Sequence, residues 1–183
     1  MKRVGVFLIL AMALIVPGSA MAQNMGDSSY YFVTYYSNNI SGAPDATLRL
    51  INDGDSGDLG AWIFVFDDSQ EMQACGACAI SADGLLSEDV KTELTNNTLT
   101  GKVPSRGVIK LVSYDGDPGI HGWATHIERA TPTSGAYSTT EAPLADSNLS
   151  GGEYTLLLDL CEYLLNLGSG QGTITCTPED HEF

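Results

Sequence analysis

The sequence predicts a mainly β fold, an antiparallel β-sandwich or flattened barrel with one amphipathic C-terminal α-helix. Short segments rich in aromatic and β-branched residues recur between polar turns from residue 29 to residue 129. One of these segments, 60–66, is apolar on both of its faces. Near residue 151 a capping box opens a long apolar stretch, which is typical of a helix.

The chain opens with the layout of a secretory signal peptide, residues 1–22. Lys2 and Arg3 give a positive start, the segment 4–16 is apolar, and small residues lead to a cleavage site after Ala22. A retained anchor is the alternative, but this segment is shorter than the roughly 20 apolar residues that a membrane-spanning helix needs. We therefore expect 23–183 to be one exported domain with no membrane span, at the cell surface, in the periplasm or outside the cell.

The charge of the chain is strongly negative. Eight basic residues stand against 23 acidic ones, a formal net charge of −15, and loss of Lys2 and Arg3 with the signal would bring it to −17. Such a surface repels phosphate backbones and anionic lipids, which argues against a nucleic-acid partner. The acidity otherwise indicates solubility, divalent-cation binding or adaptation to an acidic medium.

The strands are predicted in order along the chain. The firmest is 60–66, where alternate residues put Trp62, Phe64 and Phe66 on one face. Because its other face is also apolar, this strand should be central or covered on both sides. The remaining predicted strands are 29–37, 46–52, 72–80, 108–113, 123–129 and a final short strand at 172–177.

Two helices are predicted. Ser87 is a candidate cap for a short helix over 88–94. After 131–149, which is either a long loop or holds one more strand, a capping box from Ser150 to Glu153 opens a helix over 151–167. The polar residues of this helix form one narrow stripe: Thr155, Asp159, Glu162 and Asn166. Its apolar arc is wider than one sheet face requires, so either a second element covers its flank or part of it contacts another molecule.

The four cysteines, Cys75, Cys78, Cys161 and Cys176, predict two disulfides in an exported chain. On a strand, the odd spacing of Cys75 and Cys78 turns them to opposite faces, so each reaches a distant partner more easily. Of the three pairings we favour Cys75 with Cys161 and Cys78 with Cys176. A redox site is the alternative, but no helix is predicted after Cys78 to stabilise a thiolate. A four-cysteine zinc site is disfavoured by the wide spacing of the second pair.

The acidic loop over 53–58 is a candidate calcium site. Asp53, Asp55 and Asp58 crowd three carboxylates into a glycine-containing loop, and hard oxygen ligands of this kind suit calcium. The spacing departs from an EF-hand, because Gly57 stands at the fifth position and no glutamate stands at the twelfth. An ordinary solvated turn is the competing interpretation.

Aromatic residues near the start of the expected domain are candidate contact residues. Four tyrosines fall within one predicted strand: Tyr30, Tyr31, Tyr35 and Tyr36. Because they alternate faces, at least two should be in the core, and the others are candidates for stacking on sugar rings or contacting another subunit.

The sequence gives little indication of catalysis. Neither a nucleophile elbow nor a His-Glu-x-x-His zinc motif occurs in the sequence. His126 and Glu128 share one face of a predicted strand and form a candidate acid/base or ligand pair, with a hydrogen-bonded pair at a sheet margin as the alternative.

Several motifs carry a resemblance to a known family. The run Phe64-Val65-Phe66-Asp67, Gln70-Glu71-Met72, Cys75 with Cys78, and Trp123-Ala124-Thr125-His126-Ile127 resembles a family of uncharacterised secreted acidobacterial proteins. The similarity extends from about Leu59 to Cys176. Relatives often carry further cysteines at the positions of Gly76 and Ile174, which implies that these regions are neighbours. The resemblance implies export and disulfides, and it implies no activity.

The sequence therefore favours a non-catalytic, exported structural or interaction protein that associates with itself or with a cell-surface partner. The alternative is a carbohydrate-binding module or an accessory domain of extracellular polysaccharide metabolism. A secreted hydrolase is a second alternative.

Overall fold

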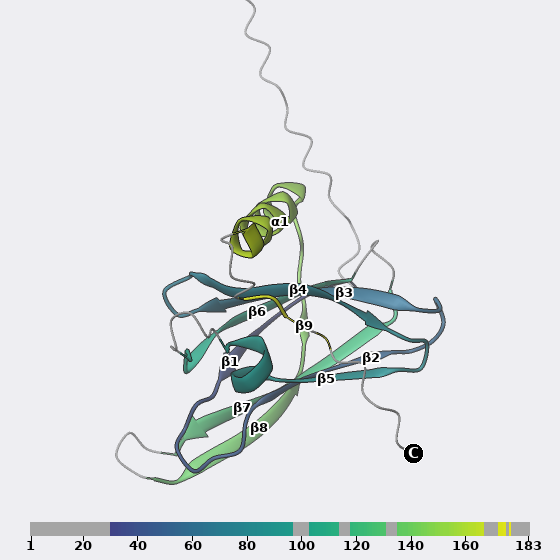
Figure 1. Ribbon diagram of the computed structural model, residues 1–183. Helices are drawn as coiled ribbons and strands as arrows, with labels where there is room; N and C mark the ends of the chain where they lie inside the picture. The colour runs from purple at the N-terminus through teal and green to yellow at the C-terminus, as the bar shows by residue number, and fades with distance from the viewer. Residues whose placement is uncertain are drawn as a thin grey trace, which may run out of the picture.

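The computed structural model describes residues 30–96, 103–113, 118–130, 135–166, 172–174 and 176. The predicted signal peptide lies outside these residues. Figure 1 shows two stacked sheets with one helix, α1, above the upper sheet. The fold class is thus confirmed as a β-sandwich, and the two sheets are not closed into a barrel.

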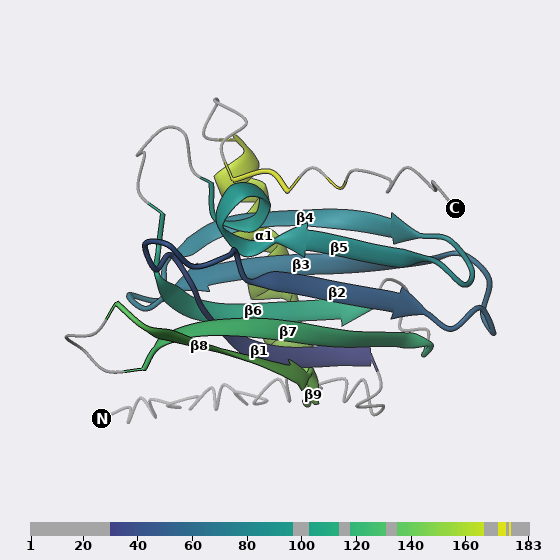
Figure 2. The same cartoon turned by 90° about the horizontal axis from the view of Figure 1, so that it is seen from below.

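Each sheet is antiparallel. The five-stranded sheet has the order β4-β3-β6-β1-β9, and the four-stranded sheet has the order β5-β2-β7-β8. The first contains β1 (Tyr31–Ser37), β3 (Leu59–Asp67), β4 (Met72–Ile80), β6 (Arg106–Ser113) and β9 (Ala145–Asp146). The second contains β2 (Thr47–Asn52), β5 (Leu85–Asp89), β7 (Ile120–Arg129) and β8 (Tyr137–Pro143). Figure 2 views the molecule from the side of the four-stranded sheet.

The strand β3 explains why the core has two layers. Its residues Ala61, Ile63 and Val65 belong to the large core between the sheets. Its other face carries Phe64, which is fully buried in a second cluster together with residues of α1. The prediction that this strand is covered on both sides is therefore confirmed, because the opposite sheet covers one face and the helix the other.

The helix α1 (Gly151–Asn166) matches its predicted range closely. Ser150 Oγ accepts a hydrogen bond from the Glu153 backbone N–H at 3.1 Å, as a capping serine should. The reciprocal half of the predicted capping box is replaced, because the Glu153 carboxylate instead accepts hydrogen bonds from β1 and β6. Glu153, which the sequence predicts as part of the helix cap, thus also links α1 to the five-stranded sheet.

Two local expectations need correction, and one alternative is decided. The predicted helix over 88–94 is strand up to Asp89, followed by a single π-helical turn, η2 (Val90–Leu94). Pairing of β5 with β2 and burial of alternate β5 residues outweigh the local capping signal of Ser87. Of the two alternatives for 131–149, the structure shows the one with strand, because this stretch contains β8 and the two-residue β9. The predicted last strand, 172–177, is reduced in its described part to one parallel bridge between Cys75 and Thr173.

Candidate functional site

The two disulfides both begin on β4. Cys75 pairs with Cys161 of α1, and Cys78 pairs with Cys176, so the bridges span 86 and 98 positions of the sequence. This is the pairing favoured from the strand geometry. Cys75 lies in the cluster beneath α1 and Cys78 lies in the core between the sheets, so the two do face opposite sides of the strand.

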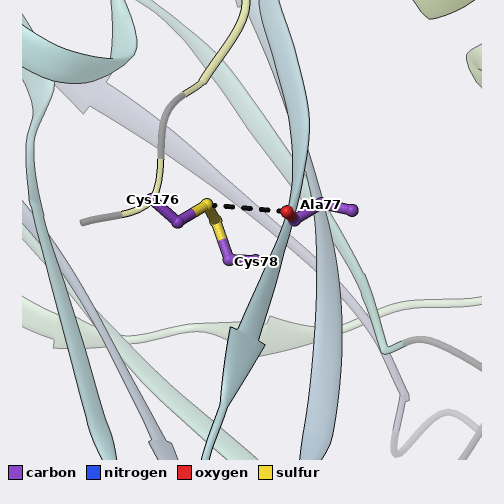
Figure 3. The surroundings of a disulfide bond; sticks show 3 residues. All are labelled: Ala77, Cys78 and Cys176. Carbon is purple, nitrogen blue, oxygen red and sulfur yellow. Dashed lines mark hydrogen bonds between the residues drawn. A yellow bond between two sulfur atoms is a disulfide. The ribbon is translucent and has the colours of Figure 1, made fainter. Parts of the chain in front are cut away.

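Figure 3 shows the Cys78–Cys176 bridge beside the strand. The Cys176 Sγ lies 3.6 Å from the Ala77 carbonyl oxygen, a contact without a donated proton because the sulfur is disulfide-bonded. With all four sulfurs in disulfides, neither the redox site nor the zinc site has a thiolate to use. A Cβ at Gly76 would lie 2.9 Å from the Ile174 Cβ, so these two positions are neighbours.

The acidic loop is built as a turn. Gly54 and Gly57 take positive φ angles of 84° and 76°. Asp53 Oδ1 accepts the Asp55 N–H at 3.1 Å, and Asp58 Oδ1 accepts the Ala82 N–H at 3.1 Å. Within the described part of the chain, the carboxylates of Asp53, Asp55 and Asp58 do not converge to within 4.8 Å of one another. The carboxylates of Asp53 and Asp58 therefore accept from different backbone N–H groups and do not share one ligand position.

The four tyrosines near the start of the domain differ in their exposure to solvent. Tyr30, Tyr31 and Tyr36 are buried, and only Tyr35 is exposed, at 50%. At least two core tyrosines were expected, and three are found. No surface platform of several tyrosines exists on β1, because one exposed ring remains.

Tyr35 connects the predicted pair His126 and Glu128. Its ring stacks on the His126 imidazole with centroids 3.9 Å apart and planes inclined by 10°, and its hydroxyl donates to Glu128 Oε1 at 3.4 Å. His126 is only 2% exposed. Burial lowers the pKa of His126, although the charge of Glu128 acts in the opposite direction. A general base must reach its substrate, so a covered imidazole here suits packing better than catalysis.

The main candidate site is a groove between α1 and the outer face of the five-stranded sheet. Its volume is about 430 Å³. Its lining combines apolar side chains with four polar or charged ones. The lining residues are Phe66, Asp67, Gln70, Val108, Lys110, Glu153, Leu156, Leu157 and Leu160. A concave, mainly apolar surface with a few polar groups is the usual form of a binding site.

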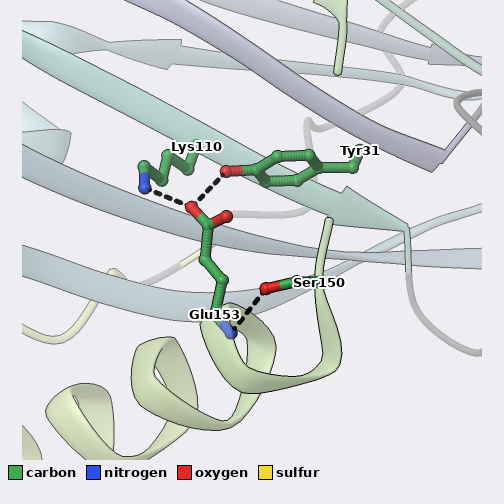
Figure 4. A network of polar contacts seen from close by, with 4 residues as sticks. All are labelled: Tyr31, Lys110, Ser150 and Glu153. Atoms are coloured by element: carbon green, nitrogen blue, oxygen red, sulfur yellow. Dashed lines mark hydrogen bonds and ion pairs between the residues drawn. The ribbon is translucent and has the colours of Figure 1, made fainter. Parts of the chain in front are cut away.

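A polar network that includes two of these lining residues, Lys110 and Glu153, joins α1 to the five-stranded sheet (Figure 4). Glu153 Oε1 accepts a hydrogen bond from the Tyr31 hydroxyl at 2.9 Å and lies 2.6 Å from the Lys110 Nζ. Burial alone would raise the pKa of Glu153, but the hydrogen bonds from Lys110 and Tyr31 outweigh it and hold that pKa below its usual value. Burial, followed by the hydrogen bond and charge of Glu153, raises the pKa of Tyr31.

Sequence reasoning missed this network. Its three members come from β1, β6 and α1, and no local spacing joins them. The one signal available was a lysine, Lys110, in the middle of an apolar predicted strand, because a charge there requires a partner.

The exposed side of α1 continues the groove. Leu156 is 55% exposed and Tyr163 is 67% exposed, and the half-buried Leu160 lies between them at helical spacing. We call these three residues the helix stripe. Only Leu157 and Cys161 of α1 are buried. In the described part of the chain, part of the wide apolar arc of α1 is therefore exposed to solvent.

The fold and the groove define a disulfide-bonded, two-sheet β-sandwich with one surface helix. No family model and no curated protein matches the chain. Among solved structures it is similar to Thermotoga maritima 1070, with 14% identity and a TM-score of 0.45, over 64% of this chain and 92% of that one. None of the helices in the described part of the chain has the length and apolar character needed to span a membrane.

Proposed function

We propose that this protein is an exported, non-catalytic interaction protein that associates with a second copy of itself through the helix stripe and the adjoining groove. The observation that carries the proposal is the outward-facing apolar stripe of Leu156, Leu160 and Tyr163 beside an apolar groove. Large exposed apolar side chains that gather on one surface are typical of interaction sites. Two disulfides are compatible with the oxidising compartment that export would provide.

The geometry favours a symmetric pair. The spacing of the helix stripe is that of the anchor residues by which a helix docks into an apolar groove. Each copy carries both the stripe and the groove, so a twofold axis would let each stripe enter the partner's groove. Lys110 and Glu153 pair with each other at the edge of the groove, which limits the number of uncompensated charges at such a contact.

Sedimentation of residues 23–183 over a range of concentrations tests the proposal. We expect a monomer–dimer equilibrium in the native protein, and we expect Leu156→Ser with Tyr163→Ser to weaken it at least tenfold. Tyr137→Ser is the matched control, because Tyr137 is also an exposed tyrosine but lies on the other sheet. A native protein that stays monomeric at high concentration would show the proposal to be wrong.

The competing functions have less support. Carbohydrate binding on a tyrosine platform loses its basis because three of the four tyrosines are buried. A hydrolase built on His126 and Glu128 is disfavoured because Tyr35 stacks over the buried imidazole.

A further inference from the structure

The outer face of the four-stranded sheet is a second surface with the character of a binding site. α1 covers the other sheet, and no described helix crosses β2 and β7 on this side (Figures 1 and 2). A hollow of about 290 Å³ lies on this face. It is lined by Arg49, Ile51, Leu85, Trp123 and Glu141.

Four neighbouring strands, β5, β2, β7 and β8, arrange these residues side by side. Ile51 of β2 is the register partner of Leu85 of β5, and both are exposed. Arg49, two positions before Ile51 and on the same face, is the register partner of Trp123 of β7. The indole therefore lies beside a guanidinium group and diagonal to an aliphatic side chain.

Polar groups border the indole in fixed positions. Arg49 Nη1 lies 2.6 Å from Glu141 Oε1 of β8, which orients two planar polar groups across the sheet. Thr47 and Thr125 share a hydrogen bond of 3.1 Å between their hydroxyls on the side away from Ile51. Donors and acceptors thus stand next to a half-buried tryptophan in this hollow.

This combination suits a sugar better than another protein. A pyranose ring offers an apolar face that can stack on an indole, and its hydroxyl groups can bond planar side chains such as Arg49 and Glu141. The apolar part of the hollow consists of the side chains of Ile51, Leu85 and Trp123. An anionic polymer would be repelled by a chain with a formal net charge of −15.

We propose that this sheet face binds a neutral polysaccharide, with Trp123 as the stacking platform and Arg49 and Glu141 as hydrogen-bonding groups. The site is separate from the groove beside α1, because the two lie on opposite outer faces of the sandwich. It uses none of the four tyrosines near the start of the domain, Tyr30, Tyr31, Tyr35 and Tyr36.

Affinity electrophoresis of residues 23–183 tests the inference. The gels contain soluble β-glucan, mannan or xylan as neutral probes, and polygalacturonate as the anionic probe. We expect retardation by at least one neutral probe and none by polygalacturonate. Trp123→Ala should reduce the affinity at least tenfold, and Arg49→Gln several-fold, while Trp123→Phe should retain part of it.

Two controls separate binding from folding and from self-association. Tyr137→Ala removes an exposed aromatic ring from the same sheet and should be retarded like the native protein. Leu156→Ser with Tyr163→Ser disrupts only the helix stripe, so the same neutral probe should still retard it. The chain has two tryptophans. In Trp62→Phe, Trp123 is the remaining one, and its emission should shift to the blue when the retarding polysaccharide is added.

Three results would overturn the inference. These are retardation by none of the neutral probes, equal retardation of a folded Trp123→Ala variant, and a changed sedimentation coefficient in that variant. The last would identify the face as a contact between copies. None of them depends on whether the helix stripe mediates self-association.

Discussion

Lys110 and Glu153 link the sheet to the helix across one edge of the groove, with 2.6 Å between the Nζ and Oε1 atoms. Glu153 also accepts the Tyr31 hydroxyl, so one carboxylate oxygen is shared by groups from two strands. Because both partners of the ion pair are half-buried, solvent weakens it but does not remove its contribution. The pair should therefore influence both stability and its dependence on pH.

Glu153→Gln should lower the free energy of unfolding at pH 7 by about 0.5–1.5 kcal/mol, the range for one hydrogen-bonded, partly screened charge pair. The pKa of Glu153 is held below the ordinary value of 4.5 in the folded protein. The stabilisation is thus complete above about pH 4.5 and is lost as the pH falls through the folded pKa. Urea unfolding at a series of pH values measures it. Glu162→Gln, on the polar stripe of the same helix, is the control and should leave this pH dependence intact.

Tyr35→Ala should raise the pKa of His126 toward its ordinary value of 6.5, because it removes the ring that covers the imidazole. In the native protein the depressed pKa means that stability falls as the pH drops below about 6.5, since the unfolded chain then binds more protons. The variant should lose part of this dependence. An NMR titration of the imidazole measures the change. Tyr35→Phe keeps the stack and should keep the low pKa; an unchanged pKa in Tyr35→Ala would contradict the explanation.

Gly107→Ala should destabilise the sandwich by about 1–3 kcal/mol, as overpacking does. A Cβ at Gly107 would lie 1.9 Å from the Phe66 carbonyl oxygen and 2.7 Å from the Tyr36 ring. The contrasting substitution is Gly152→Ala, where a Cβ meets nothing within 4 Å in the first turn of α1. It should stabilise the protein by up to about 1 kcal/mol. Thermal unfolding of both variants checks the opposite signs.

Self-association should strengthen with salt. Two copies that each carry an excess of acidic residues repel one another, and raising the ionic strength from 0.01 M to 0.15 M shortens the screening length from about 30 Å to about 8 Å. The contact proposed at the helix stripe is apolar and is not itself weakened by screening. Sedimentation at several salt concentrations measures the trend, and a dimer that dissociates as salt is added would instead indicate an ionic contact.

The sequence predicts those elements whose pattern is local. The two-sided apolar run of β3, the range of α1 and the opposite facing of Cys75 and Cys78 all follow from the periods of strands and helices. The strand β5 was missed because Ser87 resembled a helix cap and the buried Glu88 interrupts the apolar pattern. Pairing with β2 decides that segment, and a single sequence does not display pairing.

The candidate sites were harder to predict for the same reason. The groove joins Phe66 to Leu156, and the open sheet face joins Arg49 to Glu141, over separations of about 90 residues. The acidic loop and the tyrosine cluster were visible because their residues are adjacent in sequence. Residues that are close in sequence need not form one site. Tyr36 packs in the core between the sheets, whereas Tyr31 packs in the cluster beneath α1.

The positions of the two disulfides have a consequence for how an exported chain would be made. Cys75 and Cys78 would cross the membrane together, well before either Cys161 or Cys176. At that stage the only disulfide they can form within the chain is with each other, and it closes a short loop. Formation of the native disulfides would then require that this early pairing be avoided or reshuffled. The yield of correctly folded protein should therefore depend on a disulfide isomerase in the compartment that receives the chain.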